Sequence, residues 1–240
     1  MKKLIVGIAV TLSLGAFAGP RISILGDSYS TYRGYIPDGN ETWYNDCAPF
    51  RNDVTKVEET WWWQVVKGLG GQLERNNSYS GSTICYAGYK RGKPTHNDFS
   101  SFSFITRANR LGEPDIILVC GATNDSWADS PIGTNVWANW TTEDLWTFRG
   151  GMSKMCDVLQ SKYSDARIIF MLNDGLKPEI NDAVHEICAH YSIACIDLHD
   201  IDKQSNHPSI AGMKAIADQT IEFIKINPLH LQTPKTKKQP

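Results

Sequence analysis

The sequence predicts one α/β domain, a three-layer sandwich built around a doubly wound, five-stranded parallel sheet. Five short runs rich in apolar residues alternate along much of the chain with amphipathic helical patterns. Strands separated by helices need crossover connections, which produce a parallel sheet covered by helices on both faces. A chain of 240 residues suits one domain that is large enough to bury most of its apolar surface. The predicted strands span residues 21–25, 72–76, 115–120, 167–172 and 193–198.

Helical periodicity accounts for segments between and after the later strands. Apolar residues recur there at intervals of three and four, which places them on one face of a helix. We therefore predict helices over residues 145–159, 180–191 and 210–224. Their apolar positions are Leu145, Phe148, Met152, Met155 and Leu159, then Ile180, Val184, Ile187 and Tyr191, then Ile210, Met213, Ile216, Ala217 and Ile224.

Three segments do not follow this alternation. Residues 34–59 are polar, rich in turn formers and long for a connection, which is typical of an insertion on the substrate side of an enzyme. Residues 125–140 form a second irregular stretch that carries three tryptophans. Residues 229–240 are rich in lysine and proline, and we predict a disordered tail whose charges serve solvation.

The N-terminus has the pattern of an export signal. Two lysines precede an apolar run over residues 4–14, and residues 16–18 supply the small side chains that a signal peptidase reads. The run is too short to span a bilayer comfortably, which disfavours an uncleaved anchor. We therefore expect residues 1–18 to be a cleaved signal peptide and residues 19–228 to form the domain of a periplasmic or secreted protein.

The composition gives no reason to expect nucleic acid, a membrane span or a metal. The formal net charge is −2, and six cysteines are too few for a disulfide scaffold, although their pairing state is left open. Cys120, Cys156 and Cys188 fall in apolar patterns and are predicted to be buried. His185 and His190 stand five residues apart, whereas a zinc-binding helix needs histidines four apart. We predict no metal and no organic cofactor.

Polar motifs follow four of the five predicted strands. Ser28 comes after the first strand, residues 77–83 after the second, residues 121–125 after the third and residues 206–209 after the fifth. Ligands of open α/β proteins bind at the edge where the carboxyl ends of the strands meet, so these motifs are expected to converge there. A serine hydroxyl, an imidazole and amide donors at one place can carry out acyl transfer.

The four motifs resemble, in order and across nearly the whole mature chain, those of the SGNH (GDSL-type) hydrolases. The resemblance implies a flavodoxin-like fold in which Ser28 is the nucleophile and His207 is the general base. It also implies an oxyanion hole formed by the Ser28 amide, the Gly81 amide and the Asn124 side chain. The matching motifs are Gly26-Asp27-Ser28, Ser80-Gly81-Ser82-Thr83, Thr123-Asn124-Asp125 and Asn206-His207-Pro208-Ser209.

The chain departs from the family pattern at two positions. Ala122 stands where the family has a glycine two residues before the asparagine, and its methyl group would narrow the site. Gln204 stands where the family has the aspartate that orients the histidine. Of the nearby acids, Asp200 and Asp202, we favour Asp202 as the group that reaches Nδ1 of His207. The alternative is a Ser–His dyad in which the Gln204 carbonyl fixes the tautomer.

The residue after the candidate base gives an independent reason for its role. Pro208 favours the first position of a helix, which would place His207 at the positive end of that helix. The field there disfavours an imidazolium, so His207 is expected to be a neutral base at working pH.

Tryptophans are concentrated in two places. Trp61, Trp62 and Trp63 are consecutive, and because consecutive helical residues point in different directions, at least one should face the insertion or the cleft. A second group is expected near Asn124, where flat rings would suit the apolar faces of sugars. Loop anchoring and core packing explain this group equally well. The group consists of Trp127, Trp137, Trp140 and Trp146.

Taken together, these observations predict an exported serine esterase that removes short acyl groups, above all acetyl, from a carbohydrate. One alternative is a lipid-directed esterase such as a lysophospholipase or thioesterase, whose activity would rise with acyl chain length. The other is a catalytically silent glycan-binding protein, which Gln204 favours and the intact Ser28, Gly81, Asn124 and His207 disfavour.

Overall fold

The computed structural model describes residues 19–47 and 52–227. The expected signal peptide, residues 1–18, and the expected tail, residues 229–240, therefore lie outside the described residues. No helix in these two described ranges is long and apolar enough to cross a membrane.

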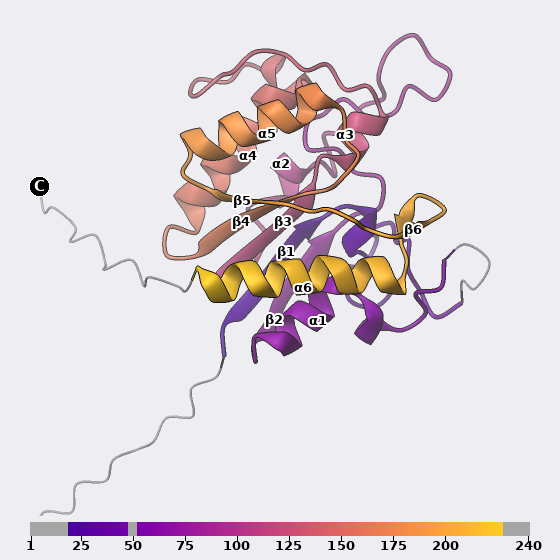
Figure 1. Cartoon of the computed structure of the whole chain (residues 1–240). Coiled ribbons are helices and arrows are strands. Elements are labelled where there is room, and N and C mark those ends of the chain that lie inside the picture. Colours follow the sequence, from indigo (N-terminus) through magenta and orange to yellow (C-terminus); the bar gives the residue numbers. More distant parts are fainter. Residues whose placement is uncertain (1–18, 48–51, 228–240) are drawn as a thin grey trace, which may run out of the picture.

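The described chain folds around a five-stranded sheet in the order β2-β1-β3-β4-β5, with every neighbouring pair parallel (Figure 1). The chain starts in the interior of the sheet and extends it first on one side and then on the other, as predicted for a doubly wound fold. The strands are β1 (Arg21–Gly26), β2 (Gln72–Ser78), β3 (Ile116–Gly121), β4 (Arg167–Leu172) and β5 (Ala194–Asp197).

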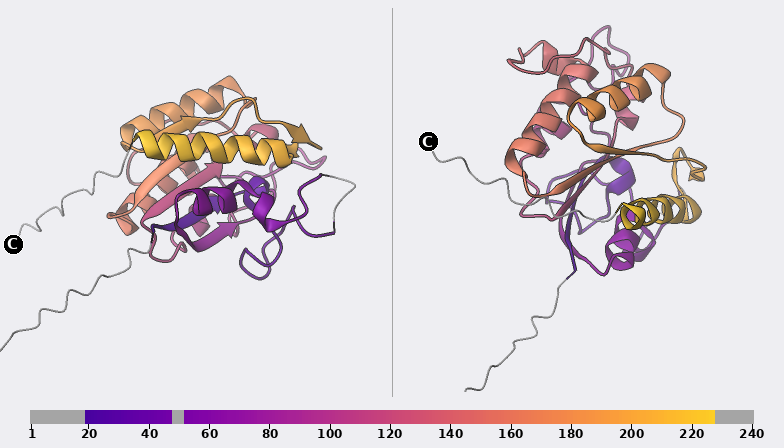
Figure 2. Two further views of the ribbon diagram at one scale, coloured as in Figure 1. Left: turned by 60° about the horizontal axis from the view of Figure 1, so that its bottom comes forward. Right: turned by 60° about the vertical axis from the view of Figure 1, so that its left-hand side comes forward.

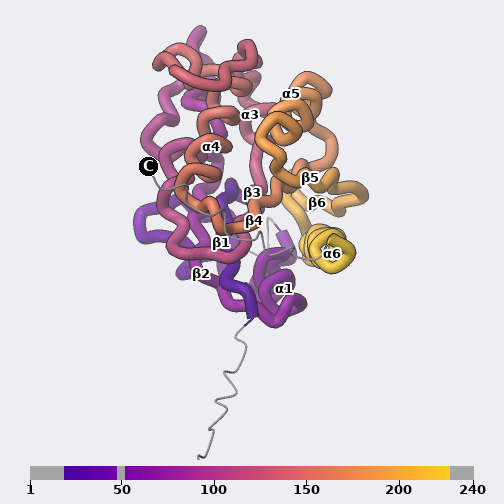
Figure 3. The backbone as a smooth tube through the Cα atoms, turned by 90° about the vertical axis from the view of Figure 1, so that its left-hand side faces the viewer, coloured from indigo at the N-terminus to yellow at the C-terminus, as the bar shows by residue number. Residues whose placement is uncertain are grey.

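Helices cover both faces of the sheet, so the predicted three-layer arrangement is confirmed (Figures 2 and 3). One face carries α2, α4 and α5, and the other carries α1 and α6. The helices are α1 (Trp61–Gly68), α2 (Phe104–Arg107), α3 (Thr123–Trp127), α4 (Phe148–Lys162), α5 (Pro178–His190) and α6 (Ile210–Ile226). Short 3-10 turns are η1 (Ser28–Ser30), η2 (Val57–Glu59) and η3 (Asp144–Trp146), and a small hairpin joins β6 (Lys203–Gln204) to β7 (His207–Pro208).

The predicted helix over residues 145–159 begins later than its apolar pattern suggests. Leu145 lies in η3, and α4 starts at Phe148 because the Thr147 hydroxyl accepts a hydrogen bond from the Gly150 amide at 3.3 Å. A threonine in this position caps the first turn of a helix and so sets its start.

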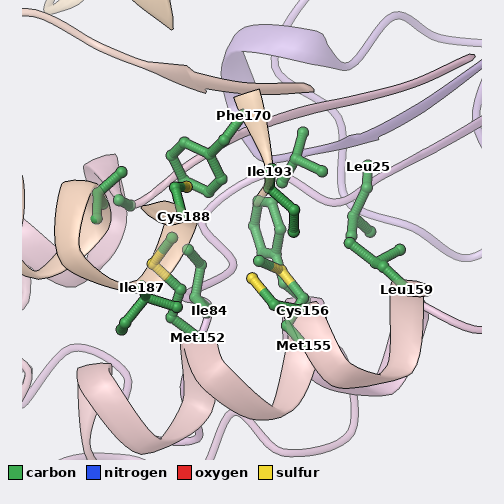
Figure 4. Close-up of a cluster of buried hydrophobic side chains, with 14 of the residues drawn as sticks. Leu25, Ile84, Met152, Met155, Cys156, Leu159, Phe170, Ile187, Cys188 and Ile193 are labelled. Atoms are coloured by element: carbon green, nitrogen blue, oxygen red, sulfur yellow. The ribbon is translucent and has the colours of Figure 1, made fainter. Parts of the chain in front are cut away.

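Alternate residues of the central strands fill two separate cores. Phe170 of β4 points to the face where Met152 and Leu159 of α4 and Ile187 of α5 pack (Figure 4). Ile24 of β1 faces the opposite core, beneath α1 and α6. Both faces of a parallel sheet are thus buried, as its near-continuous apolar strands require.

The three consecutive tryptophans divide between the core and the insertion. Trp61 and Trp62 are fully buried in the core beneath α1, and Trp61 Nε1 donates to the Tyr29 carbonyl at 3.1 Å. The ring of Tyr35, in the insertion, lies 5.8 Å from that of Trp62 and 5.9 Å from that of Trp63. The expectation that at least one of the three faces the insertion is confirmed.

Candidate active site

The turn after β1 holds Ser28 at the carboxyl edge of the sheet. Only glycine fits at Gly26, because a Cβ there would lie 2.4 Å from Ser30 Oγ. The Asp27 carboxylate then accepts a hydrogen bond from the Tyr29 amide at 3.0 Å, which starts η1 at Ser28. Ser28 is 3% exposed, so its hydroxyl lies at the base of the site rather than on the surface.

His207 lies against this serine. Its Nε2 is 3.0 Å from Ser28 Oγ, and its Nδ1 is 3.0 Å from the Ser205 carbonyl oxygen. A carbonyl can only accept a hydrogen bond, so Nδ1 carries the proton and Nε2 accepts from the serine hydroxyl. Ser205 and Asn206 have φ values of 50° and 61°, and this tight turn directs the Ser205 carbonyl toward the ring. The geometry therefore fixes the tautomer that a general base needs.

Burial keeps the imidazole neutral. It lowers the pKa of His207 to about 4, and the hydrogen bond to the Ser205 carbonyl opposes this effect. The cause differs from the one predicted. His207 and Pro208 form β7, and α6 starts only at Ile210 after Ser209 caps it, so Pro208 does not open the helix.

The candidate acids do not meet the imidazole. The Asp202 carboxylate accepts a hydrogen bond from Ser209 Oγ, beside the start of α6, and Asp200 bonds to His199 Nδ1 at 2.8 Å. The structure thus does not bring Asp202 to Nδ1 of His207, because the Ser205 carbonyl holds that position.

The Gln204 side chain does not bond to the His207 ring either. It connects the β6–β7 hairpin to Asp53 of the insertion. Its Oε1 accepts from the Asp53 amide and its Nε2 donates to the Asp53 carboxylate, both at 3.0 Å. The other oxygen of that carboxylate accepts from the Ile210 amide at 2.8 Å. A glutamine can make both contacts to Asp53, whereas an aspartate there could only accept hydrogen bonds.

Three further side chains support the β6–β7 hairpin, and sequence reasoning did not find them. Asn52 Nδ2 lies 3.1–3.3 Å from the carbonyl oxygens of Gln204, His207 and Pro208. The hydroxyl of Tyr29 donates to the Asn206 carbonyl at 2.8 Å, and that of Tyr44 to the Pro208 carbonyl at 2.9 Å. Asn52 and Tyr44 belong to the insertion, where no motif or periodicity marks them, so only the fold reveals their role.

Asn124 presents an unused donor at the carboxyl end of β3, the strand next to β1 in the sheet. It lies in α3, directly after β3, and its buried Nδ2 has no hydrogen-bond partner among the described residues. Its Oδ1 accepts from the Tyr89 hydroxyl at 2.6 Å, which fixes the amide so that the NH₂ group is the end left over. A buried donor without a partner is costly unless a ligand uses it.

Gly81 and Ala122, in the two loops that precede the predicted oxyanion-hole donors or carry them, both have positive φ values. Gly81 has φ of 84°, which favours glycine, and the space where its side chain would lie is open. Ala122 has φ of 72° and is buried in the core, so its methyl group packs away while the backbone accepts the strain. The amides of Ser28 and Gly81, like Asn124 Nδ2, have no hydrogen-bond acceptor within the described ranges.

Buried charges hold the loops that carry these donors. Arg107 is buried, and it donates to the carbonyls of Asn77 and Phe102 and, at 2.8 Å, to Ser82 Oγ. Burial lowers the pKa of Arg107 to about 9, while attraction to Asp27 opposes this. The same burial raises the pKa of Asp27 to about 7. A buried guanidinium that satisfies backbone carbonyls fixes the Gly81 loop in place.

Asp125 links the loop after β2 to α3. Its carboxylate accepts from the amides of Ile84 at 2.8 Å and Cys85 at 3.2 Å. Burial raises the pKa of Asp125 to about 6, although these two amides favour the ionised form. The contact keeps Gly81 and Asn124 in one rigid unit.

Aromatic rings surround His207 on several sides. Trp43 lies parallel to the imidazole, with ring centroids 3.5 Å apart and an interplanar angle of 7°. Tyr29, Trp127 and Tyr44 approach at 5.3, 6.1 and 6.3 Å with tilted or edge-on rings. Trp127 is 42% exposed, so part of its ring lies open to solvent beside the base.

The other tryptophans of the predicted group lie elsewhere. Trp137 stacks on His190 at 3.8 Å, Trp140 is covered by the Lys154 ammonium and Trp146 meets Tyr86 edge-on. Of these four tryptophans, Trp127 is the one whose ring contacts those of His207 and Tyr29. Sequence reasoning did not single out Trp43, which lies in the insertion far from the motifs.

One group of metal-ligating side chains occurs in the described ranges. His185, Cys195 and Asp197 place their ligand atoms within 4.8 Å of one another, on α5 and the edge strand β5. His185 Nε2 is already 2.7 Å from an Asp197 oxygen, which accounts for both side chains as an exposed hydrogen-bonded pair. The group includes none of the residues around Ser28.

Comparison with known proteins gives one family. A sequence model of the GDSL-like lipase/acylhydrolase family matches residues 20–224. Two solved structures, candidate GDSL-like lipases from Bacteroides ovatus and Bacteroides uniformis, are each 49% identical to the chain. They cover 87% of it, and it covers 99% and 96% of them, with TM-scores of 0.84 and 0.82.

More distant structures share the fold alone. A family two carbohydrate esterase from Clostridium thermocellum, solved with cellohexaose, is 14% identical, with a TM-score of 0.54. The match covers 88% of this chain and 65% of that one. No functionally curated protein matches the sequence.

We expect His207 to titrate near pH 4, well below a typical histidine, because its burial penalises the imidazolium. NMR titration of ¹³C-labelled histidine measures this directly, and unfolding the protein in denaturant should restore a value of about 6.5. Between about pH 4 and pH 6.5 the His207 imidazole is neutral in the folded protein and protonated in the unfolded chain. The free energy of unfolding should therefore fall as pH drops from about 6.5 toward 4. A midpoint near 6.5 in the folded protein would contradict the buried base.

Proposed function

Since the chain belongs to the GDSL-like lipase/acylhydrolase family, we propose that it is an esterase in which Ser28 is the nucleophile and His207 is the general base. The observation that carries this proposal is the 3.0 Å contact between Ser28 Oγ and His207 Nε2. The tautomer set by the Ser205 carbonyl leaves Nε2 ready to accept the serine proton.

The proposed reaction has two halves. In the first, Ser28 Oγ attacks the ester carbonyl while His207 Nε2 takes its proton, and the oxyanion accepts hydrogen bonds from three donors. These are the amides of Ser28 and Gly81 and Asn124 Nδ2, all without acceptors among the described residues. His207 then returns the proton to the leaving alcohol. In the second half, His207 activates a water that attacks the acyl-serine and releases the acid.

We propose that the base works without a carboxylate. The Ser205 carbonyl performs the orienting part of the carboxylate's role, while Asp202 supports the start of α6 through Ser209. The proposed machinery is then a Ser28–His207 dyad. It differs from the dyad predicted from the sequence, because the Ser205 carbonyl and not the Gln204 carbonyl contacts Nδ1.

The substrate is proposed to be an acetylated or similarly short-chain ester of a carbohydrate. Ser28 and His207 are 3% and 6% exposed, which restricts the acyl group that can reach them. The open part of the Trp127 ring offers a flat apolar surface beside the base, which suits the face of a sugar. The fold, shared with a carbohydrate esterase, is compatible with such a substrate.

We also propose that the protein is exported. The support is the lysine pair and apolar run within residues 1–18, which lie outside the described residues. N-terminal sequencing of the mature protein, expected to begin at Gly19, tests this.

Ser28→Ala should abolish both hydrolysis of p-nitrophenyl acetate and labelling by a fluorophosphonate, because each needs the activated hydroxyl. Ser161→Ala, at an exposed position of α4, is the control and should keep both. Wild-type activity should fall from acetate to octanoate esters. A rise with chain length would favour the lipid-directed alternative, and a wild type that is not labelled would favour a silent binding protein.

Asn124→Ala should lower kcat by roughly 10²–10³ with little change in KM, because an oxyanion donor acts mainly in the transition state. Tyr89→Phe should cause a smaller fall of the same kind, since it frees the Asn124 amide to rotate. Tyr86→Phe is the matched control, with its ring against Trp146. A rise in KM at constant kcat would instead make Asn124 a substrate-binding group.

Asp202→Asn should change kcat by no more than about threefold, because the imidazole does not use this carboxylate. Loss of an orienting aspartate from a full triad costs around 10⁴. Asparagine keeps an oxygen that can accept from Ser209, so the start of α6 should survive, and circular dichroism checks this. A loss of 10³ or more would show that Asp202 reaches the base during turnover.

A further inference from the structure

The candidate base develops a positive charge, and no carboxylate of residues 19–47 or 52–227 hydrogen-bonds to its ring. When His207 takes the serine proton it becomes an imidazolium in a position that is 6% exposed. In a triad a carboxylate at Nδ1 stabilises that charge, but here Nδ1 meets the neutral Ser205 carbonyl. A buried cation without compensation raises the barrier to its own formation.

Trp43 covers one whole face of the imidazole. The two rings are nearly parallel, with centroids 3.5 Å apart, whereas the other aromatic neighbours are tilted or edge-on. Indole carries the strongest negative potential on its face of the neutral aromatic side chains, and a cation within about 6 Å of the ring is attracted to it. The attraction grows when water is excluded, as it is at this buried base.

The backbone of Trp43 is tied to the turn that carries the nucleophile. Its amide donates to Thr31 Oγ1 at 2.8 Å, and that hydroxyl donates to the Ser28 carbonyl at 3.1 Å. The indole, the serine and the imidazole are therefore placed relative to one another by direct contacts. Such contacts limit the drift of the stack as charge develops.

We propose that Trp43 is a positioning residue whose indole face stabilises the His207 imidazolium in the transition state, in place of the missing carboxylate. The proposal rests on the proposed esterase function. It assigns to the insertion an electrostatic part in catalysis.

Two buried carboxyls of the site titrate in the range of an esterase assay, so the acid limb is assigned to His207 by its NMR titration. Burial raises the pKa of Asp27, next to Ser28, to about 7 and that of Asp125 to about 6. The phenols of Tyr29 and Tyr44 are the titratable side chains whose rings contact His207, from η1 and from the insertion. Burial raises the pKa of both, so both stay neutral over the range of an esterase assay. Trp43 and Trp127 carry no charge, and His207 also contacts Ser28 Oγ and the Ser205 carbonyl.

The test replaces Trp43 with mono-, di- and trifluorotryptophan by nonsense suppression, which withdraws charge from the ring face with little change in shape. We expect kcat on an acetyl ester to fall stepwise, roughly two- to threefold per fluorine, with KM nearly constant. The acid limb of the kcat/KM profile should move to lower pH, because a weaker ring face lowers the pKa of the base. Trp43→Leu should lower kcat roughly ten- to thirtyfold, and the kcat of Trp43→Phe should lie between those of Trp43→Leu and the wild type.

A purely structural role for Trp43 predicts different results. Looser packing would admit water and raise the pKa of His207, moving the acid limb to higher pH, while fluorination would change little. The same fluorinated series at Trp62, which is fully buried in the core beneath α1 and α6 and contacts Tyr35, is the control for packing effects.

NMR titration of His207 in the fluorinated proteins separates this proposal from the esterase proposal, because it needs no turnover. A pKa that falls with each fluorine supports the stack even if no ester is hydrolysed, in which case the proposed function fails alone. If the enzyme is active but neither its kcat nor the pKa of His207 changes with fluorination of Trp43, the proposed role of Trp43 is wrong.

Discussion

The contact between His207 Nδ1 and the Ser205 carbonyl is the interaction on which the rest of the site depends. It decides which nitrogen faces Ser28, and it comes from the main chain of the same hairpin that carries the histidine. A backbone acceptor cannot rotate away as a side chain can, but it holds its position only while the turn keeps its shape. The positive φ values of Ser205 and Asn206 are the conformational cost of that placement.

Three side chains of the surrounding structure hold this turn. Tyr29 reaches it from η1, and Tyr44 and Asn52 reach it from the insertion, each through a buried or partly buried hydrogen bond to a carbonyl. Across the site, Arg107 and Asp125 order the loops with Gly81 and Asn124 in the same way, by satisfying backbone groups rather than by pairing with one another. Both halves of the site thus rely on side chains that bond to the main chain, which confers rigidity where a reaction needs fixed donors.

The fold could be predicted from the sequence because it rests on periodic apolar patterns, and the five strands and the three long helices lie close to where those patterns place them. The contact between Ser28 and His207 was predicted because motifs that follow parallel strands share one edge of the sheet, and Asn124 follows β3 at that same edge. The start of α4 was missed because Thr147 caps it, and the partners of Asp202 and Gln204 were missed because irregular loops have no period. Trp43 and Asn52 could not be predicted, because contacts between residues so far apart in the sequence, 155 residues for Asn52 and His207, leave no local signal.

The way Gln204 and Asn52 fasten the insertion to the hairpin has a consequence for how this enzyme can diversify. In many scaffolds a peripheral loop is exchanged to alter ligand preference while the reactive centre stays as it was. Here the loop that would shape ligand preference is also fastened to the imidazole's own turn and supplies the ring stacked on it. Under the proposed mechanism, replacing the whole loop would remove Trp43 and the supports of the turn at the same time, so a change of ligand preference that keeps activity is expected to come from single replacements at the outer positions of the loop.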